Sequence, residues 1–579
     1  MDSQRLPAAV AADPDDHAGG DSRCLAPVAR HGRRRGNAPP SGPDHHWRPD
    51  HQPDPDPLHH TGGLPLSRPR APSLQQMARR AYRCCPGHCA MTDSTFAKLA
   101  MTRGSRVASL VLCGALLSAC AVGPDYKRPD VIEPVQFKEA QGWRQATPSD
   151  SLARGAWWEL YGDRQLNDLV VRLNNANQTV AQAEARFRQA QALVRSSRGA
   201  FYPTVDLSAG KTRASQGTGS SSASLSSSSS GIRDTLNAQL GVSWEADIWG
   251  KLRRGLEANE ASAEASSADL AAMRLSQQSE LVQSYLQLRV MDEQTRLLQA
   301  TLDTYQRSLQ MTENQYRAGV SGKDAVAQAQ TQLKSTQASL IDLIWQRAQL
   351  ENAIAVLIGE APANFNLAVS KDIPALPQIP VSLPSQLLER RPDIASAERS
   401  VIAANANIGV AKAAYYPDLS LSLAGGYSSS TYADWISLPN RFWSVGPKLA
   451  MTLFDGGQRS AEVDRSVASY DETVAKYRQT VLDGFREVEN YMVQLKVLED
   501  EAVVSNEALD AARESLRLTQ NQYKAGLIAY LDVVTVQATA LSNERTVLTL
   551  LQTRLVASVQ LIAALGGGWD GQTAIDAKD

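Results

Sequence analysis

The chain has 579 residues, with 59 basic and 61 acidic side chains and a formal net charge of −2. This near-neutral balance gives no indication of nucleic-acid binding. All eight histidines and all six cysteines lie within the first 120 residues. Ser-His triads, thiol catalysis and His-ligated metals are therefore excluded beyond residue 120. We expect no enzyme, no cofactor and no metal site there.

Residues 1–100 are rich in Pro and His and show no apolar period of 2 or 3.6. We expect a disordered extension, or upstream sequence read from a start set too early. A His-rich metal-binding tail is the alternative. Residues 101–119 have the pattern of an export signal, with a basic start and a short apolar stretch. Translation would begin at Met101 or at Met91.

The signal ends in Leu-Ser-Ala followed by Cys120, which resembles a bacterial lipobox. We expect lipidation of Cys120 and anchoring in outer-membrane lipid, because Ala121 stands where an Asp would favour inner-membrane retention. An ordinary signal with an incidental Cys120 is the alternative. After residue 120 no run of 18 apolar residues remains, so no transmembrane helix is expected.

The mature chain contains an internal repeat. "SLQMTENQYRAGV" (308–320) recurs 207 residues later as "SLRLTQNQYKAGL" (515–527). We therefore expect two repeats, 120–375 and 376–579, joined by a Pro-rich linker. Each is expected to open with a helix, at 164–199 and about 393–414.

Alternating apolar and polar residues then predict a β-hairpin in each repeat, at about 203–247 and 418–454, the last strand reaching residue 454. Strands of about ten residues with one apolar face are typical of a membrane barrel. A soluble antiparallel sandwich with one wet face is the alternative.

Each hairpin is followed by a long helical hairpin, at about 251–358 and 458–565. The first helix of each has 66 helix-compatible residues, enough for ~100 Å. Gly319 and Gly526 suit the left-handed position after these helices. Small residues and Gln dominate where a heptad would be apolar, which favours a closed cylinder over a coiled-coil stalk. Four strands cannot close around a pore, so copies must pool them.

The chain resembles the TolC-like outer-membrane efflux protein family, in its lipidated branch serving RND-type multidrug pumps. The motifs are "VGPDYKRP" (122–129), "LLERRPDI" (387–394), "LFDGGQR" (453–459), both "NQY[RK]AG" turns and "LGGGW" (565–569). The resemblance implies an α+β membrane protein. It implies a homotrimer with a 12-strand outer-membrane β-barrel, a 12-helix periplasmic α-barrel and an equatorial belt that includes the C-terminal tail. It also implies a periplasmic adaptor and an inner-membrane RND-type pump as partners.

The expected function is a passive conduit through the outer membrane for drugs or other small molecules. A type I secretion channel and a structural or adhesive lipoprotein are the alternatives. Carboxylate-pair catalysis by Glu245 and Asp247 is the enzyme alternative, against a role as lumen-facing barrel residues. No Walker or dinucleotide phosphate loop is found, so a partner must supply the energy.

By resemblance, the resting channel closes at the turns after the long helices, where Asp rings narrow the pore. Asp532 matches one ring, while Thr535 replaces the second acid and Asp324 is offset by one position. An Asp in the first turn of a helix is also a common stabilising feature, and this is the alternative for Asp532. The remaining expected gate residues are Leu531, Tyr523 and Lys524.

The tips of the two helical hairpins, which we call the first tip (314–324) and the second tip (521–531), are expected to dock the adaptor. The residues expected to carry this contact are Arg317, Gly319, Lys524 and Gly526. The alternative is that they are simply exposed turns.

Overall fold

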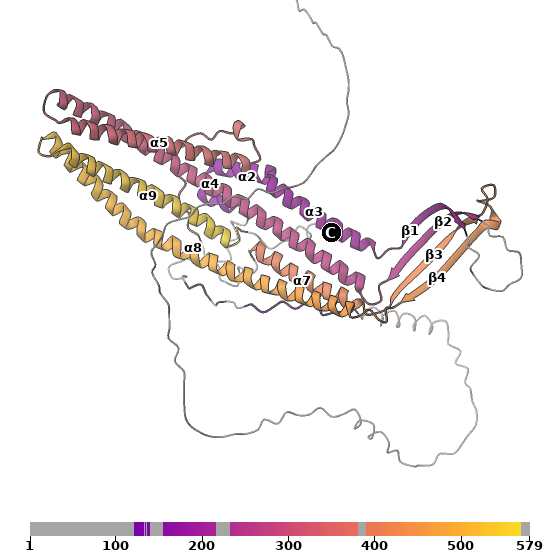
Figure 1. Cartoon of the computed structure of the whole chain (residues 1–579). Helices are drawn as coiled ribbons and strands as arrows, with labels where there is room; N and C mark the ends of the chain where they lie inside the picture. Colours follow the sequence, from indigo (N-terminus) through magenta and orange to yellow (C-terminus); the bar gives the residue numbers. More distant parts are fainter. Residues whose placement is uncertain are drawn as a thin grey trace, which may run out of the picture. The chain divides into compact units, whose positions relative to one another are not determined.

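The structure is a computed structural model of the whole chain, drawn in Figure 1. It describes residues 121–131, 134, 136–138, 155–215, 232–379 and 390–568. The expected extension, the signal peptide, Cys120 and the C-terminal tail beyond residue 568 lie outside the described residues.

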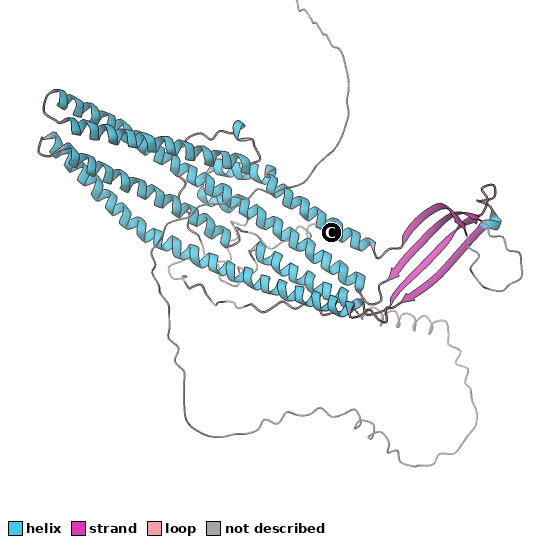
Figure 2. Cartoon of the chain, in the orientation of Figure 1, coloured by secondary structure: helices cyan, strands magenta, loops and turns pink. Residues whose placement is uncertain are grey.

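Two long helical hairpins follow the two pairs of strands (Figures 1 and 2). The first consists of α4 (Lys251–Arg317) and α5 (Lys323–Leu357), and the second of α8 (Gln458–Lys524) and α9 (Tyr530–Ala564). The outgoing helices have 67 residues each and the returning helices 35 each, with starts 207 positions apart. At 1.5 Å per residue an outgoing helix extends for ~100 Å. These bounds agree with the sequence predictions to within one residue.

The helix expected over 164–199 is in fact two helices, α2 (Arg164–Ala176) and α3 (Gln178–Gly199). Asn177 separates them in an extended conformation, with φ −65° and ψ 123°. Its side-chain oxygen accepts from the N–H of Val180 (2.9 Å), and its amide nitrogen donates to the carbonyl of Leu357 (2.7 Å). The prediction of one helix was wrong because a buried Asn satisfies its hydrogen bonds better as a cap than inside a helix.

The helices pack lengthwise, around one large apolar core and three smaller buried clusters. α4 contacts α2, α3, α5, α9 and α7 (Pro392–Ala413), while α8 contacts α7 and α9. Fully buried side chains from six of these helices meet in the large core, including Leu281 and Tyr285 of α4, Val481 of α8 and Leu555 of α9. Short 3-10 turns occupy Trp157–Tyr161, Pro362–Asn364 and Leu438–Asn440.

One described helix, α9, is long and apolar enough to cross a membrane by length and composition alone. Its apolar residues are used for packing, because Leu555, Val559 and Leu561 are completely buried in the core. The helix also runs alongside α8. Its composition is therefore explained by helix packing.

The four strands form one antiparallel sheet in the order β1-β2-β3-β4, and they are β1 (Thr204–Ser215), β2 (Ile232–Ala246), β3 (Asp418–Ser429) and β4 (Arg441–Ala450). The last strand ends four residues earlier than predicted. Its partner β3 begins at Asp418, opposite Ala450, so later residues have no strand to pair with. Within the described residues the strands make a single sheet, not the two layers of a sandwich.

The sheet has one apolar face and one polar face. Residues that pair across the ladder share a face, and Leu207, Leu240, Leu423 and Val445 all lie on the same one. These side chains are between 41% and 79% exposed. The opposite face carries Ser, Asn, Gln, Asp and Glu, as the alternation predicted. An exposed apolar face of this kind indicates a surface made for contact with something other than water.

The chain after residue 120 runs along the helices. The N–H of Val122 donates to the carbonyl of Trp249 (3.0 Å), and the side chain of Asn405 donates to the carbonyl of Pro124 (3.0 Å). Arg254, largely buried, forms an ion pair with Asp125 (2.7 Å). These contacts fix Val122 beside the start of α4, where the helices meet the sheet.

Candidate functional site

Both helical hairpins turn through the same backbone motif. Gly319 and Gly526 follow the outgoing helices with φ of 74° and 72°, the left-handed region that disfavours other residues. The two hydrogen bonds of a Schellman motif close each turn. In the first turn the N–H of Gly319 donates to the carbonyl of Tyr316 (3.0 Å) and that of Val320 to the carbonyl of Gln315 (2.9 Å). In the second turn the N–H of Gly526 donates to the carbonyl of Tyr523 (2.9 Å) and that of Leu527 to the carbonyl of Gln522 (3.0 Å). The predicted left-handed glycines are confirmed.

Basic side chains project from both tips. Arg317 is exposed and donates to the side-chain oxygen of Asn314. Lys524 is exposed and makes no ion pair with any residue that the structure describes. Each tip thus presents a basic side chain two residues before its turning glycine, and the first tip also carries the exposed Lys323. This arrangement is open to a partner. Docking of an adaptor here stays a prediction.

The two expected gate acids lie in the first turns of the returning helices but at different positions. Asp324 is the second residue of α5, and Asp532 is the third residue of α9. The carboxylate of Asp532 accepts from the N–H of Ala529 (3.2 Å), so it stabilises the start of its helix. One position corresponds to ~100° around a helix, so the two acids lie on different faces of their equivalent helices.

The neighbours of Asp532 on α9 are also exposed. Leu531 is 54% exposed, and Thr535 is exposed with its hydroxyl donating to the carbonyl of Leu531 (3.0 Å). The structure therefore brings Asp532, Leu531 and Thr535 together on the outside of the single chain, at the start of α9. Their role in a gate stays a prediction.

Tyr523 links the two tips. Its hydroxyl donates to the side-chain oxygen of Gln315 at 2.6 Å, and this joins the end of α8 to the end of α4 across 208 residues of sequence. The ring of Tyr523 packs against that of Tyr530, with centroids 5.6 Å apart. Gln315 was missed by sequence reasoning. Its place in the repeated "NQY" motif was the available signal.

An apolar cluster holds the tips together around this link. Tyr530 and Val533 of α9 are buried against Ala325 and Ala329 of α5. Burial, with smaller contributions from nearby tyrosines, raises the pKa of Tyr530 to about 12. The ring therefore stays neutral at physiological pH and packs as an apolar group.

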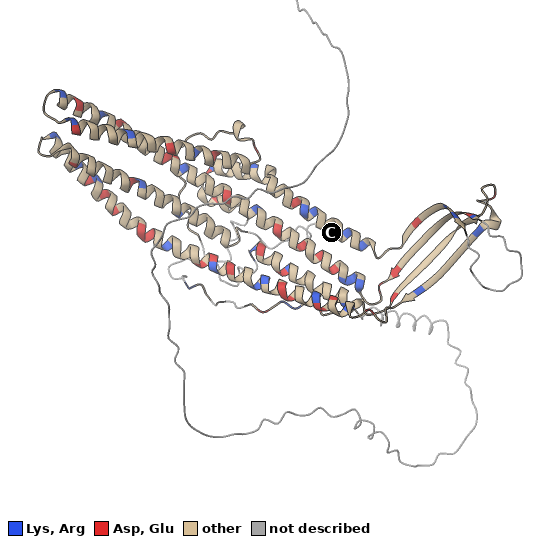
Figure 3. Cartoon of the chain, in the orientation of Figure 1, with Lys and Arg blue, Asp and Glu red and all other residues tan. Residues whose placement is uncertain are grey.

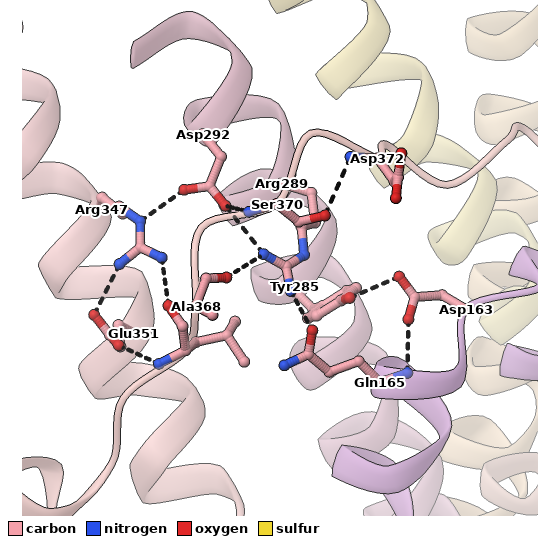
Figure 4. A network of polar contacts seen from close by, with 11 residues as sticks. Asp163, Gln165, Tyr285, Arg289, Asp292, Arg347, Glu351, Ala368, Ser370 and Asp372 are labelled. Atoms are coloured by element: carbon pink, nitrogen blue, oxygen red, sulfur yellow. Dashed lines mark hydrogen bonds and ion pairs between the residues drawn. The ribbon is translucent and has the colours of Figure 1, made fainter. Parts of the chain in front are cut away.

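A second feature that the sequence did not predict is a buried polar network beside the segment after α5 (Figure 4). Asp292 of α4, whose side chain is fully buried, accepts from Arg289 (3.0 Å) and Arg347 (2.7 Å). Arg347 also pairs with Glu351 (3.0 Å). The same groups also bond the backbone of residues 367–370. The guanidinium of Arg347 donates to the carbonyl of Leu367 (2.7 Å), and the N–H of Ser370 donates to the carboxylate of Asp292 (3.2 Å). This network ties that segment to the hairpin of α4 and α5.

The two carboxylates considered for catalysis have structural partners. Glu245, at the end of β2, pairs with Lys251 (3.2 Å). Asp247 lies after the strand, not on it, and accepts from the N–H groups of Leu252 (3.1 Å) and Arg253 (2.9 Å). Asp247 thus caps the start of α4, and placing both carboxylates on one strand face was wrong.

Comparisons with known proteins identify the family. Residues 169–360 and 383–567 match the family described as "Outer membrane efflux protein". The chain is 31% identical to the pyoverdine export outer membrane protein OpmQ of Pseudomonas aeruginosa over 465 residues, which cover 80% of this chain and 96% of OpmQ. It is 28% identical to the cation efflux system protein CusC of Escherichia coli O6:H1 over 462 residues, 79% of this chain and 98% of CusC.

The structure is similar to that of the outer-membrane channel OprN, with a TM-score of 0.72 and 29% identity. The likeness covers 78% of this chain and all of OprN. The family match, the relatives and this fold agree with the exposed apolar sheet and the paired helical hairpins. The chain belongs to the outer membrane efflux protein family and is an outer-membrane channel component of tripartite efflux pumps.

Proposed function

We propose that three copies of this chain form a passive tube, with a 12-strand β-barrel in the outer membrane and a 12-helix α-barrel in the periplasm. The observation that carries this proposal is the sheet, because β1 and β4 are unpaired edges and one face is apolar and exposed. In lipid each unpaired backbone group costs several kcal/mol, so the edges must be paired. Two copies would give eight strands, whose interior is filled by side chains, whereas three leave a pore.

The tunnel is built from the two repeats, 120–375 and 376–579. Each contributes one helical hairpin, and the equal lengths of α4 and α8 and of α5 and α9 allow six similar hairpins to close a ring. We expect a periplasmic adaptor to bind the two tips and an inner-membrane RND-type pump to supply the energy and select the substrate. OpmQ and CusC are named for pyoverdine export and cation efflux, and this chain serves a pump of the same general kind.

Cys120 is the proposed lipid anchor, after removal of the signal peptide at 101–119. The support comes from Val122, which is held beside Trp249 where the helices meet the sheet. An acyl chain two residues earlier would be close to the membrane surface, where lipid anchors act.

The gate is proposed at the two tips. The Tyr523–Gln315 link holds the end of α8 against α4, and the exposed Asp532, Leu531 and Thr535 would line the constriction when three copies meet. Three carboxylates around a narrow pore favour cations. Asp324 is offset by one position on the equivalent helix and so lies on another face of it. We therefore propose a single acidic ring with Asp532 alone.

The test is single-channel recording of the purified protein in planar bilayers. We expect stepwise currents with cation selectivity, and a clear loss of selectivity in Asp532→Ala. Asp342→Ala is the matched control, because Asp342 is also an exposed Asp on a returning helix but is far from the tips. Absence of channels would refute the conduit. Channels with unchanged selectivity in Asp532→Ala would refute only the acidic ring.

A further inference from the structure

Charged residues lie at both ends of the sheet (Figure 3), but those on its apolar face are unevenly distributed. The strands join the helices at one end of the sheet, and the turns between strands lie at the other, which we call the distal end. Along the four strands, every charged residue on the apolar face lies at the distal end. They are Lys211, Arg213, Asp234 and Arg441.

These charges are out of balance. Lys211 and Arg213 share the single carboxylate of Asp234, at 3.1 Å and 3.6 Å. Arg441 is exposed and makes no ion pair with any residue that the structure describes. The loop after β3 adds one more acid, Asp434, whose carbonyl accepts from Ser437 (2.7 Å) and Asn440 (2.6 Å). By contrast, Lys251 at the opposite end pairs with two carboxylates.

The position of these groups matches the outer boundary of a bilayer. Arg213 lies nine residues along β1 from Thr204, about 30 Å at the usual strand rise. With a strand tilt of ~40°, this corresponds to a height of ~23 Å, close to the ~25 Å apolar band of membrane barrels. Aromatic side chains of the kind found at this boundary lie nearby, with Trp443 76% exposed and Tyr432 67% exposed.

Closing the barrel concentrates the positive charge. Lys211 and Arg213 lie on edge strand β1, and Arg441 lies on edge strand β4. When β4 of one copy pairs with β1 of the next, three cations gather at the distal end of each seam with one carboxylate, Asp234. The strand residues of this cluster carry a net charge of +2, or +1 when Asp434 of the neighbouring loop is counted. This excess would be repulsive in a low-dielectric setting unless an anion neutralises it.

We propose that the distal ends of these seams bind the phosphorylated glycolipid of the outer leaflet, with its phosphate monoester held by Lys211 and Arg213 of one copy and Arg441 of the next. This inference rests on the proposed trimeric barrel. A phosphate monoester carries a charge of about −2, which complements the seam, and offers three acceptor oxygens to Lys and Arg donors. The exposed Ile436 and Leu438 of the loop after β3 provide apolar contact beside it.

The test is native mass spectrometry of the detergent-purified full protein titrated with bis-phosphorylated lipid A. We expect trimers with bound lipid A, and at least tenfold weaker binding of enzymatically dephosphorylated lipid A or of phosphatidylglycerol. The triple variant Lys211→Gln, Arg213→Gln and Arg441→Gln should lose at least tenfold in affinity. Arg233→Gln is the matched control, since Arg233 lies at the same end of the sheet but on its polar face.

Equal binding of lipid A with and without phosphate, equal binding of phosphatidylglycerol, or an equal loss in Arg233→Gln would overturn the proposal. The charge-preserving variant Lys211→Arg with Arg213→Lys and Arg441→Lys should retain binding, and its failure to do so would count against a charge-based site. The masses of the intact complexes report oligomeric state and bound lipid separately, so the test of the lipid site is distinct from the test of the trimer. Trimers without phosphate-dependent binding refute the lipid site, whereas a monomer that binds lipid A in the wild-type manner refutes the seam.

Discussion

Asp292 is the residue on which the buried polar network depends. Its side chain is fully buried between two guanidinium groups and also accepts a backbone N–H. Asp292→Ala would leave Arg289 and Arg347 buried without their shared carboxylate. Removing one partner of a buried ion pair typically costs ~3–5 kcal/mol. We expect a marked fall in thermal stability, measured by circular dichroism of the purified protein.

The control for this prediction is Asp303→Ala, because Asp303 is exposed on the same helix. A surface change of this kind is usually within ~0.5 kcal/mol. Equal losses in the two variants would show that the network adds nothing specific. The carboxylate of Glu351 accepts a hydrogen bond from the backbone N–H of Leu367 at 2.5 Å. We expect Glu351→Gln to lower thermal stability by an amount between those of the two Asp variants.

The Tyr523–Gln315 hydrogen bond gives a second prediction for single side chains. Tyr523→Phe removes the donor and keeps the ring contact with Tyr530. A net loss of ~1 kcal/mol would favour separated tips about fivefold, which we expect to see as a higher open probability in planar bilayers. Gln315→Ala should act similarly, and the double variant should be no stronger than either single one. Additive effects would show that the two side chains act independently.

Sequence reasoning could identify Tyr523 but not its partner. The repeat marks both "NQY" motifs, yet a contact between the Tyr of one and the Gln of the other depends on how the hairpins lie side by side. The network around Asp292 was likewise hidden. At the 207-residue spacing, Glu499 and Arg554 match Asp292 and Arg347. Lys496 and Ser558 stand where Arg289 and Glu351 would be, so the repeat keeps only half of the network and does not reveal it.

At the scale of elements, the two hairpin turns depend on a glycine in the left-handed region. Gly526→Ala forces a Cβ into a conformation with φ of 72°, at a cost of ~1 kcal/mol. We expect faster amide hydrogen exchange over 521–531 and unchanged exchange in the core of α8. Gly255→Ala is the matched substitution, since Gly255 lies inside α4 with open space around its Cα.

The change in stability should have the opposite sign in Gly255→Ala. Alanine is favoured over glycine inside a helix by ~1 kcal/mol, so Gly255→Ala should be neutral or stabilising. Faster exchange at the second tip in Gly255→Ala, or none in Gly526→Ala, would contradict the role assigned to the turn.

The sequence predicted most elements because their signals are local. Glycine follows the end of each long helix, and alternation marks the strands. Errors arose where tertiary contacts decide. Asn177 breaks a helix because Leu357 and Val180 satisfy its side chain, and β4 stops at Ala450 because β3 begins opposite it. The sheet order β1-β2-β3-β4 also joins the two repeats through β2 and β3, which periodicity alone cannot show.

At the scale of the whole molecule, the repeat makes a prediction about contacts between copies. Gln522 and Tyr316 stand 207 positions from Gln315 and Tyr523, and both are exposed in the single chain. In a ring of alternating hairpins, each Tyr316 should therefore meet Gln522 of an adjacent copy, as Tyr523 meets Gln315 within the chain. No Cys follows residue 120, so introduced thiols can be cross-linked cleanly.

A short bismaleimide should cross-link Tyr316→Cys with Gln522→Cys into covalent dimers and trimers on denaturing gels. The same reagent should join Tyr523→Cys with Gln315→Cys within one chain, leaving the monomer mass. Tyr316→Cys alone is the control and should stay monomeric. Covalent dimers and trimers from the Tyr523→Cys with Gln315→Cys variant would be inconsistent with the proposed ring. So would their absence from the Tyr316→Cys with Gln522→Cys variant.

The free edges of the sheet also affect the period before assembly. A newly exported chain would carry two unpaired edge strands and an exposed apolar surface through the aqueous periplasm. Unpaired edge strands readily pair with other chains and cause aggregation. Pro447 in β4 offers no amide hydrogen to a stray strand, and the cations near the end of β1 repel copies of themselves. These features disfavour aggregation before assembly, so that in the proposed trimer the edges would pair only with those of sister chains in the outer membrane.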